Sequence, residues 1–425
     1  MKIAVVGAGI SGLGCAWRLA RAGLDVTLFE ADTRFGGHSN TVEVSLEGQS
    51  AGVDTGFLVF NHRTYPRLCS LFEELGVDVA DSDMSFSVQM PRAGRKLEWS
   101  GSSVDTVFAQ RRNLFDRRFI GMLADIARFN RLATAAVQHE AGPLSLGDFL
   151  DLHGFGAPFR DWYLLPMAAC IWSCPTAQML AFPLSTFARF CHNHGLLQVT
   201  DRPQWRTVRG GSRHYVQRML AQIPQRMAGA PVLSVRRMPM GGPHPVRVRT
   251  AAAEQFFDEV VLACHSDQAL ALLGDADVMQ RRVLESVGYQ QNRAVLHTDA
   301  SCLPRKRKAW AAWNYEGAGP GDPRVCVHYL LNRLQPLPFR KPVLLSLNPL
   351  REPESGTVLA QFDYAHPVFD QRAVDAQRWL PQAQGRGHVW LAGAWTGYGF
   401  HEDGLRSGLE VADALIAKAQ VRHAA

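Results

Sequence analysis

An apolar run that ends in a glycine-rich turn constrains the fold of this chain more than any other feature. Ile3 to Val6 predict a buried strand, and a G-x-G-x-x-G turn follows directly over residues 7–12. An apolar stretch that Gly23 stops predicts a helix, and Asp25 to Phe29 predict a second strand. This order of elements is the βαβ unit that binds dinucleotides, with the pyrophosphate at the helix N-terminus.

Each residue of the turn has an expected task. Gly7 permits the tight bend, Gly9 lets the backbone approach a pyrophosphate, and Gly12 lets the helix pack closely on the strand. Ser11 stands in the first helical turn, beside the same phosphates. Glu30, at the end of the second strand, can accept both ribose hydroxyls, and its charge disfavours a 2′-phosphate. The turn therefore predicts FAD or NAD rather than NADP.

The segment after Glu30 favours FAD. Arg34 precedes the paired Gly36 and Gly37, and this turn resembles the second phosphate-and-ribitol element of glutathione-reductase-like flavoproteins, in particular the amine oxidase and phytoene desaturase group. Paired glycines bring the backbone against an extended cofactor, and an arginine offers charge to its pyrophosphate. The resemblance implies that FAD contacts Ala31, Arg34, Gly36, Gly37, His38 and Ser39.

The C-terminal stretch Val389 to Leu409 is a second match, read as a strand, a glycine-rich loop and a helix. In the resembled superfamily this region closes the flavin site, and a helix N-terminus there would stabilise negative charge on the reduced ring. The residues that this resemblance implies for FAD are Gly393, Ala394, Asp403, Gly404, Leu405 and Ser407.

A third match begins at Arg209-Gly210-Gly211-Ser212, ahead of a helix over 214–221 and strands over 231–235, 245–250 and 258–263. Gly241-Gly242-Pro243 predict a hairpin turn between the first two strands. In flavin amine oxidases the first of these strands contacts adenine, which implies Val232 here. The block DTGFLVFN adds Gly56 and Phe57 to the expected cofactor residues.

With these blocks, and with GGHSNTV, CHNHGLL and QNRAVLHTD, the whole chain resembles a bacterial subgroup of the FAD-dependent amine oxidoreductase and phytoene desaturase superfamily. The resemblance implies an α/β fold, in which a Rossmann-like, glutathione-reductase-like FAD-binding domain is interleaved with an α+β, amine-oxidase-like substrate domain. We expect the FAD domain at 1–75, 205–285 and 386–425, and the substrate domain at 76–204 and 286–385.

Two departures from amine oxidases concern the chemistry. The strand expected at Asn292 to Thr298 holds no lysine, and Asp403-Gly404 is preceded by His401 and Glu402 rather than by an aromatic residue. An aromatic cage suits an amine that must be held and desolvated, so its apparent loss makes simple amine oxidation less expected. Gly393-Ala394, as in the desaturase branch, favours an apolar substrate.

Candidate catalytic residues stand beside the C-terminal loop. His401 is expected near the flavin as a proton donor or acceptor because imidazole titrates near neutral pH, and Tyr398 is expected in the same pocket. A loop histidine bonded to backbone is the alternative. His192-Asn193-His194 lacks further ligands at metal spacing, so no metal is expected. Cys170 and Cys174 are expected to be structural thiols.

Composition and charge limit the setting. The chain has 425 residues, 47% of them hydrophobic, and eight cysteines without a disulfide framework, which predicts two globular domains in a reducing cytoplasm. The first residues predict a fold strand rather than a signal peptide. The formal net charge is +6, and basic segments lie at 111–118 and 305–308, the second followed by Trp310 and Trp313. The amphipathic helix expected over 111–137 allows peripheral contact with the inner face of a membrane; an ordinary solvated basic face is the alternative. No motif supports nucleic-acid binding.

These observations predict an FAD-dependent oxidoreductase, of oxidase or desaturase type, that removes a hydride equivalent from a hydrophobic and lipid-like small molecule. The apolar stretch from Trp162 to Leu197 is expected to wall its pocket, or else to form a domain core. The alternatives are a flavin amine oxidase and a flavin-binding protein without net redox turnover, for example an isomerase.

Overall fold

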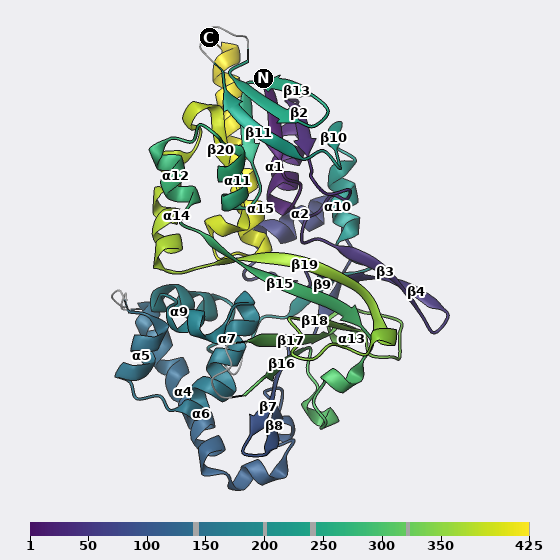
Figure 1. Cartoon of the computed structure of the whole chain (residues 1–425), viewed down its shortest axis with the longest axis vertical. Helices are drawn as coiled ribbons and strands as arrows, with labels where there is room; N and C mark the ends of the chain where they lie inside the picture. Colours follow the sequence, from purple (N-terminus) through teal and green to yellow (C-terminus); the bar gives the residue numbers. More distant parts are fainter. Residues whose placement is uncertain (139–143, 199–201, 239–243, 320–323, 425) are drawn as a thin grey trace.

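The computed structural model describes residues 1–138, 144–198, 202–238, 244–319 and 324–424. The upper body in Figure 1 is built on a five-stranded parallel sheet with the order β10-β2-β1-β14-β20. Its strands are β1 (Lys2–Val6), β2 (Asp25–Phe29), β10 (Gln225–Met227), β14 (Glu259–Leu262) and β20 (Val389–Leu391). Most of their residues are buried, as expected of a parallel sheet covered on both faces. The predicted α/β class is confirmed.

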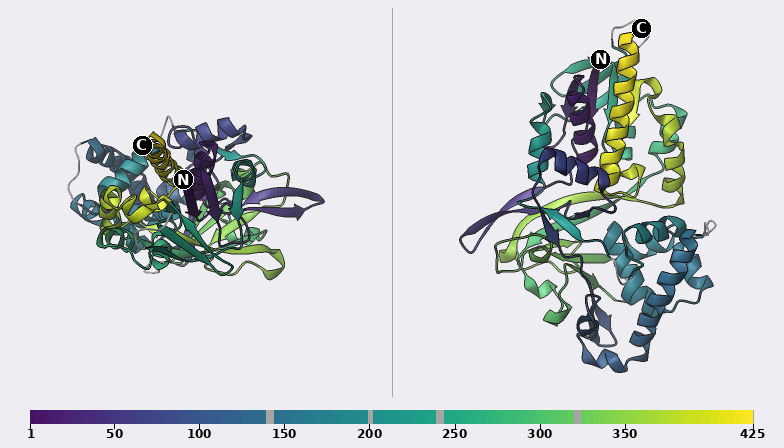
Figure 2. Two further views of the ribbon diagram at one scale, coloured as in Figure 1. Left: turned by 90° about the horizontal axis from the view of Figure 1, so that it is seen from above. Right: turned by 180° about the vertical axis from the view of Figure 1, so that it is seen from behind.

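Two helices from opposite ends of the chain pack side by side on this sheet (Figure 2). They are α1 (Ile10–Arg21) and α15 (His401–Ala424), with α2 (Pro66–Leu75) and α10 (Arg213–Leu220) beside them. Glycines allow the close approach: a Cβ on Gly408 would lie 2.1 Å from the carbonyl oxygen of Ser11, and one on Gly14 would lie 2.7 Å from Leu405 Cδ1. The chain's two ends are thereby locked into one cofactor-binding layer.

A small antiparallel sheet lies beside the parallel one. It consists of β11 (Val232–Arg237), β12 (Val246–Thr250) and β13 (Glu254–Phe257), and β13 was not expected from the sequence. The predicted turn Gly241-Gly242-Pro243 lies outside the described residues. The helices of this side are α11 (Ser266–Leu272), α12 (Val278–Leu284) and α14 (Gln371–Ala383).

The lower body holds a mixed seven-stranded sheet with the order β19-β15-β18-β17-β16-β7-β8. Its strands are β7 (Phe86–Arg92), β8 (Arg95–Ser100), β15 (Gly288–His297), β16 (Trp313–Gly317), β17 (Val325–Leu330), β18 (Leu344–Leu347) and β19 (Val358–Val368). The long antiparallel pair of β15 and β19 crosses the middle of the molecule between the two bodies (Figure 1). The short helix α13 (Leu331–Leu334) follows β17.

The two faces of this sheet differ in character. One face carries Phe86, Trp313, Tyr329 and Leu345 in register across four strands. The opposite face carries a buried polar row in register, which is Ser100, Ser87, Asn314, His328 and Ser346. The polar row is satisfied internally: Ser87 Oγ donates to Asn314 Oδ1 at 2.8 Å, and Ser346 Oγ lies 2.6 Å from His328 Nδ1. The apolar face is therefore free to line a cavity.

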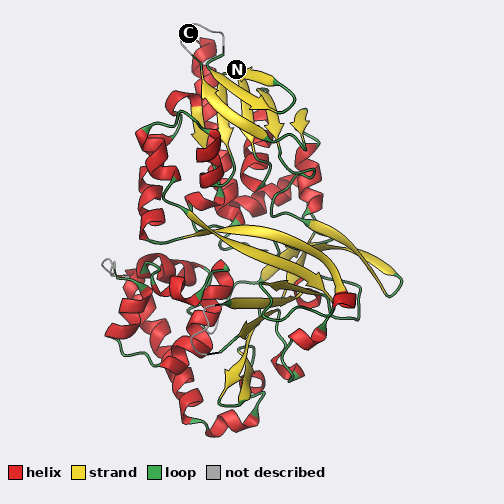
Figure 3. Ribbon diagram, viewed as in Figure 1, coloured by secondary structure: helices red, strands yellow, loops and turns green. Residues whose placement is uncertain are grey.

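Helices cover one side of the lower body (Figure 3). They are α3 (Val104–Val107), η1 (Arg111–Phe115), α4 (Arg117–Gln138), α5 (Leu146–Leu152), α6 (Ala157–Phe159), η2 (Arg160–Leu164), α7 (Leu165–Trp172), α8 (Thr176–Leu180) and α9 (Leu184–Asn193). The helix predicted over 111–137 is broken at Asp116, whose carboxylate accepts hydrogen bonds from the backbone of Arg118 and Phe119 and so begins α4 anew.

Shorter elements connect the two bodies. They are the hairpin of β3 (Thr41–Leu46) and β4 (Gln49–Asp54), the strands β5 (Phe60–Asn61), β6 (Val79–Ser82) and β9 (Trp205–Val208), and the 3₁₀ turns η3 (Ala300–Cys302), η4 (Arg307–Ala309), η5 (Ser355–Thr357), η6 (Arg386–His388) and η7 (Ala394–Thr396). β6 pairs with β9, and α14 packs on α12, so contacts cross the predicted domain limits. Those limits remain a prediction.

Candidate functional site

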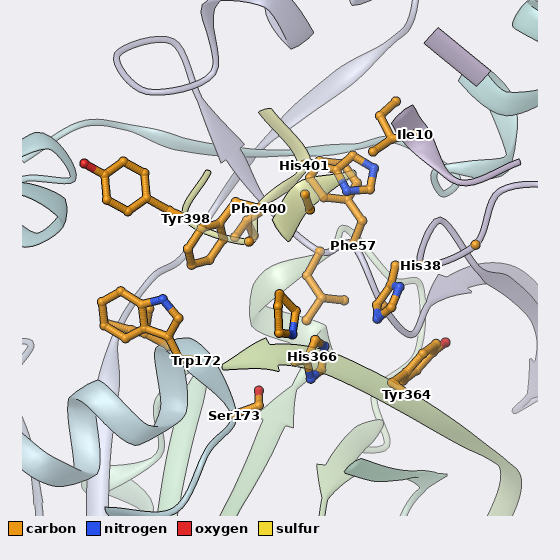
Figure 4. Close-up of a pocket in the computed structure, with 18 of the residues that line it drawn as sticks. Ile10, His38, Phe57, Trp172, Ser173, Tyr364, His366, Tyr398, Phe400 and His401 are labelled. Atoms are coloured by element: carbon orange, nitrogen blue, oxygen red, sulfur yellow. The ribbon is translucent and has the colours of Figure 1, made fainter. Parts of the chain in front are cut away.

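A cavity of about 1230 Å³ reaches from the glycine turn after β1 to the apolar face of the seven-stranded sheet. Figure 4 shows part of its wall, where residues of the two bodies face each other. Pockets that hold a single drug-sized ligand have volumes of about 300–1,000 Å³. The cavity therefore has room for a dinucleotide together with a second molecule.

The upper end of the cavity brings together the sequence-distant turns expected to hold FAD. The predicted cofactor residues in its wall are Gly7, Gly9, Ser11, Glu30, Ala31, Gly37, His38, Gly56, Phe57, Val232, Gly393 and Ala394. The two glycine turns touch, because a Cβ on Gly37 would lie 3.0 Å from the Cα of Gly9. Glu30 Oε2 accepts a hydrogen bond from the Ala8 backbone at 2.8 Å, which fixes the acid beside the turn.

The other predicted cofactor residues stand behind this wall. They are Gly12, Arg34, Gly36, Ser39, Asp403, Gly404, Leu405 and Ser407. Gly12 allows the tight turn, since its Cβ would lie 1.8 Å from the carbonyl oxygen of Gly7. Ser407 Oγ accepts a hydrogen bond from the Gly393 backbone at 2.9 Å, and Leu405 is a fully buried core residue. These residues therefore support the wall of the cavity, and their contact with the cofactor stays a prediction.

The start of α15 differs from expectation in one respect. The described cavity wall includes Phe400 and His401, whereas the predicted cofactor residues between Asp403 and Ser407 lie deeper in the helix. Asp403 caps the helix instead: its Oδ2 accepts a hydrogen bond from the Phe400 backbone at 3.1 Å, and burial raises its pKa to about 6. The helix still directs its N-terminal end toward the cavity.

The cofactor end fits an FAD molecule by two structural tests. A Cβ on Gly9 would meet no protein atom within 4 Å, so the space above this residue is open for a ligand. Among the described residues, Arg34 Nη1 and His38 Nε2 are buried without a hydrogen-bond partner. An unpartnered buried guanidinium nitrogen is costly, and a phosphate oxygen would satisfy it.

His401 lies in the cavity wall, and its ring stacks on Phe57 with centroids 3.9 Å apart. Its Nε2 lies 2.7 Å from the Tyr215 hydroxyl and 3.0 Å from Ser39 Oγ. Burial lowers its pKa to about 3, so the imidazole is neutral at pH 7. The prediction that the His401 imidazole titrates near neutral pH is therefore wrong. Its position in the cavity wall still makes His401 a candidate for contact with the cofactor or the substrate.

Tyr398 also lies in the wall, as expected, within an aromatic group whose member Phe400 the sequence did not predict. Phe400 stacks on Phe190 at 5.0 Å, Tyr398 lies 5.8 Å from Phe190, and Trp172 lies 4.6 Å from the same ring. Phe400 precedes His401 directly and Tyr398 stands three residues before it, so aromatic side chains do line the wall beside this loop. Burial raises the pKa of Tyr398, which keeps its hydroxyl protonated.

The lower end of the cavity is apolar. The residues that form it are Phe86, Trp99, Tyr163, Met167, Cys170, Ile171, Trp172, Phe190, Trp313, Tyr329, Leu345 and Leu347. Of the stretch expected to wall the pocket, Tyr163, Trp172 and Phe190 do so, whereas Phe182 and Phe187 belong to the core. Trp313, which follows the second basic segment in the sequence, lines this end of the cavity, so it does not belong to the basic surface that the sequence allowed at a membrane.

Two polar features of the wall were also missed. The Tyr364 hydroxyl accepts a hydrogen bond from Asn40 Nδ2 at 3.0 Å. The ring centroids of His366 and His38 lie 5.2 Å apart (Figure 4). Phe362, Tyr364 and His366 alternate along β19, and this spacing could have placed them on one face.

The backbone is irregular where α7 begins and ends. The π-helical turn η2 leads into α7, and Ser173, directly after α7, has a φ of +52°. Such backbone irregularities gather at functional sites.

Comparison with known proteins identifies the family. Residues 10–291, about two thirds of the chain, match the model of the flavin containing amine oxidoreductases. The chain belongs to this family. The members of this family are flavin-containing oxidoreductases, and FAD is the cofactor, as the resemblance implied. No helix of the described ranges is long and apolar enough to cross a membrane.

Three relatives illustrate the range of this flavoprotein fold. A lysine-specific histone demethylase 1B homolog of Caenorhabditis elegans is 28% identical over 165 residues, covering 36% of this chain and 19% of that protein. Cyclohexylamine oxidase from Brevibacterium oxydans superposes with a TM-score of 0.68 at 15% identity, covering 99% of both chains. A fatty acid isomerase from P. acnes, described as producing CLA, superposes with a TM-score of 0.67 at 15% identity, covering 97% of this chain and 98% of that one.

The chain spans less than half the length of the curated relatives that it matches. The superpositions at 15% identity show a shared fold.

The flavoprotein holds a separate cluster of residues of metal-ligating type on the polar face of the seven-stranded sheet. His328 belongs to two such groups, one with His297 and Cys302 and the other with Glu316 and Cys326. In each group the candidate ligand atoms lie within 4.8 Å of one another. Hydrogen bonds already occupy the two histidines: His328 Nε2 lies 3.0 Å from Glu316 Oε2, and His297 Nε2 lies 2.6 Å from Ser346 Oγ.

Cys170 and Cys174 are buried free thiols.

Proposed function

We propose that this flavoprotein removes a hydride equivalent from a C–H bond of a hydrophobic, lipid-like substrate, as an oxidase or desaturase. Bound FAD supplies the redox chemistry by taking up two electrons from the substrate and passing them to an acceptor. The chain itself binds the apolar part of the substrate, orients it and excludes water from the reacting end.

The chemistry of the cavity wall carries this proposal. The carboxylates in its described wall are Glu30, at the dinucleotide turn, and Asp83, whose Oδ2 lies 3.3 Å from Arg333 Nη1. A primary or secondary amine is largely a cation at pH 7, and burying it without a counter-charge is unfavourable. Aromatic and aliphatic side chains fill the lower end instead, which favours a hydrocarbon chain.

The fold neighbours are compatible with this substrate class. One of them is described as a fatty acid isomerase and another as cyclohexylamine oxidase, so the same scaffold accommodates lipid and amine chemistry. The wall of this chain's cavity, rather than the fold, is what favours the lipid.

Anaerobic reduction of the bound flavin tests the proposal. We would mix the holoprotein with a phosphatidylglycerol carrying unsaturated acyl chains, a free fatty acid, an isoprenoid or one of several amines. We expect loss of the oxidised-flavin absorbance with at least one acyl or isoprenoid compound and a product lighter by two hydrogens. Reduction by amines alone would overturn the proposal.

Amine oxidation is the second candidate, favoured by the aromatic group of Trp172, Phe190, Tyr398 and Phe400, which can hold a neutral or cationic amine. It predicts peroxide release with an amine panel in air. A product isomerised without net flavin reduction would instead support the alternative without redox turnover.

A further inference from the structure

Two basic segments that lie far apart in the sequence meet at one end of the molecule. Asp105 of α3 accepts hydrogen bonds from Arg111 of η1 and, at 2.9 Å, from Lys308 of η4. Glu98 fixes the second segment, because its carboxylate accepts hydrogen bonds from the backbone of Arg305 and Lys306, each at 3.0 Å. The tertiary structure therefore builds a single cationic surface from residues about 200 positions apart in sequence.

We call this surface the basic tip and define its cations as Arg111, Arg112, Arg117, Arg118, Arg307 and Lys308, all of them exposed. It lies beyond β7 and β8, at the end of the molecule opposite both chain termini (Figure 1). Asp105 neutralises only part of this charge, and Asp116 pairs with Arg92, which is not one of these six cations. The tip therefore keeps an excess of positive charge.

Exposed apolar side chains stand among these cations. Phe115 is 89% exposed and Val104 is 78% exposed, and Leu114 and Ile120 are exposed beside them. Single exposed apolar residues are ordinary, but four within a stretch of less than twenty residues, next to the cations of the tip, favour an interaction site. Cations around protruding aromatic and aliphatic groups match a bilayer surface, with its anionic headgroups and hydrocarbon below.

The tip adjoins the cavity. Gly101 and Ser102 are exposed residues of the cavity wall, and Ser103 caps the helix that begins with Val104. Trp99 of the wall packs on Phe119 of α4, with ring centroids 6.0 Å apart. A bilayer bound at the tip would therefore lie next to one opening of the cavity.

We propose that the basic tip docks this flavoprotein on a membrane surface rich in anionic phospholipid, with Phe115 and Val104 inserted and the surrounding arginines and Lys308 on the headgroups. The docking itself does not need the proposed function. If the substrate is an acyl or isoprenoid chain, docking also gives it a short path into the cavity. Trp310 plays no inserted part, because its Nε1 donates to the Pro304 carbonyl oxygen at 2.7 Å.

Vesicle sedimentation of the full-length holoprotein tests the docking without any turnover. We expect binding to vesicles of phosphatidylcholine with 30 mol% phosphatidylglycerol, at least tenfold weaker binding to phosphatidylcholine alone, and strong weakening in 0.5 M salt. Absence of binding to the anionic vesicles, or equal binding to both, would overturn the proposal. Tight salt-sensitive binding to RNA or DNA without binding to vesicles would overturn it too, since the tip would then be a nucleic-acid surface.

Matched variants locate the surface. We expect Phe115→Ser together with Arg118→Glu to weaken binding to the anionic vesicles at least tenfold. The control joins Val278→Ser, at a residue 85% exposed on α12, with Arg372→Glu on α14, and it should bind like the parent. Retained flavin absorbance shows that each variant is folded. An unchanged tip variant, or an equal loss in the control, would contradict the proposal, whereas lipid turnover in detergent tests the proposed function separately.

Discussion

The two ends of the cavity are built in opposite ways. The cofactor end is made of backbone and glycine: Gly7, Gly9, Gly37, Gly56 and Gly393 all lie in its wall. The substrate end is made of large side chains on elements that are distant in sequence, for example Trp99 of β8, Ile171 of α7 and Leu345 of β18. A ligand that is the same in every relative can be held by a local backbone motif, whereas a substrate that differs among them is selected by replaceable side chains.

The largest expected effect breaks the cofactor end alone. We predict that Gly9→Val abolishes flavin binding without unfolding the chain, because the added side chain occupies ligand space and meets no protein atom at its Cβ. Flavin absorbance of the purified protein and its circular dichroism measure the two properties. The control Gly121→Ala, also in open space but on α4, should keep all of its flavin and gain about 0.5–1 kcal/mol of stability.

The substrate end should fail independently of the cofactor. We predict that Ile171→Trp lowers kcat/KM for an apolar substrate by roughly 10- to 100-fold while the flavin content stays normal, because the larger ring fills the pocket. Leu152→Trp, at a residue 70% exposed on α5, supplies the same change away from the cavity. Loss of flavin in Ile171→Trp would show that the two ends are not separable.

Charge at the cofactor end should matter less than space. We predict that Arg34→Gln weakens FAD binding roughly ten- to hundredfold, because a hydrogen bond from a charged donor contributes about 1.5–3 kcal/mol. Titration of the apoprotein with FAD, followed by flavin fluorescence, gives the dissociation constant. Arg21→Gln removes an exposed arginine that pairs with Glu74, and an equal weakening there would refute a specific contact of Arg34.

His401, between the two ends, should reveal itself through pH. Its pKa is about 3 in the folded chain and about 6.5 when unfolded, so the unfolded state alone takes up a proton between these values. Its contribution to stability is therefore full above pH 6.5 and decreases as the pH falls. We predict that the difference in unfolding free energy between the parent and His401→Asn shrinks by about 2 kcal/mol from pH 7.5 to pH 5.

Urea unfolding at the two pH values measures this difference. The exposed His62 provides the matched change His62→Asn. A shrinkage of the same size in that variant would contradict burial as the cause.

Sequence reasoning was strongest where the signal is local. The strand, turn and helix around Gly7 to Gly12 needed only neighbouring residues, and the structure confirms them. It failed where environment decides: the pKa of His401 depends on burial under Phe57, and Trp313 faces inward because β16 pairs in register with β7 and β17. Neither environment can be read from the residues beside these positions.

The sequence by itself determined that the chain folds around a dinucleotide turn, because three glycines and an acid encode that geometry within one βαβ unit. Only the tertiary structure decided which side chains form the apolar end, and that Arg111 and Lys308 meet at Asp105. The physical reason is range: backbone conformation is set by near neighbours, whereas burial, register and electrostatic pairing arise only when distant segments pack together.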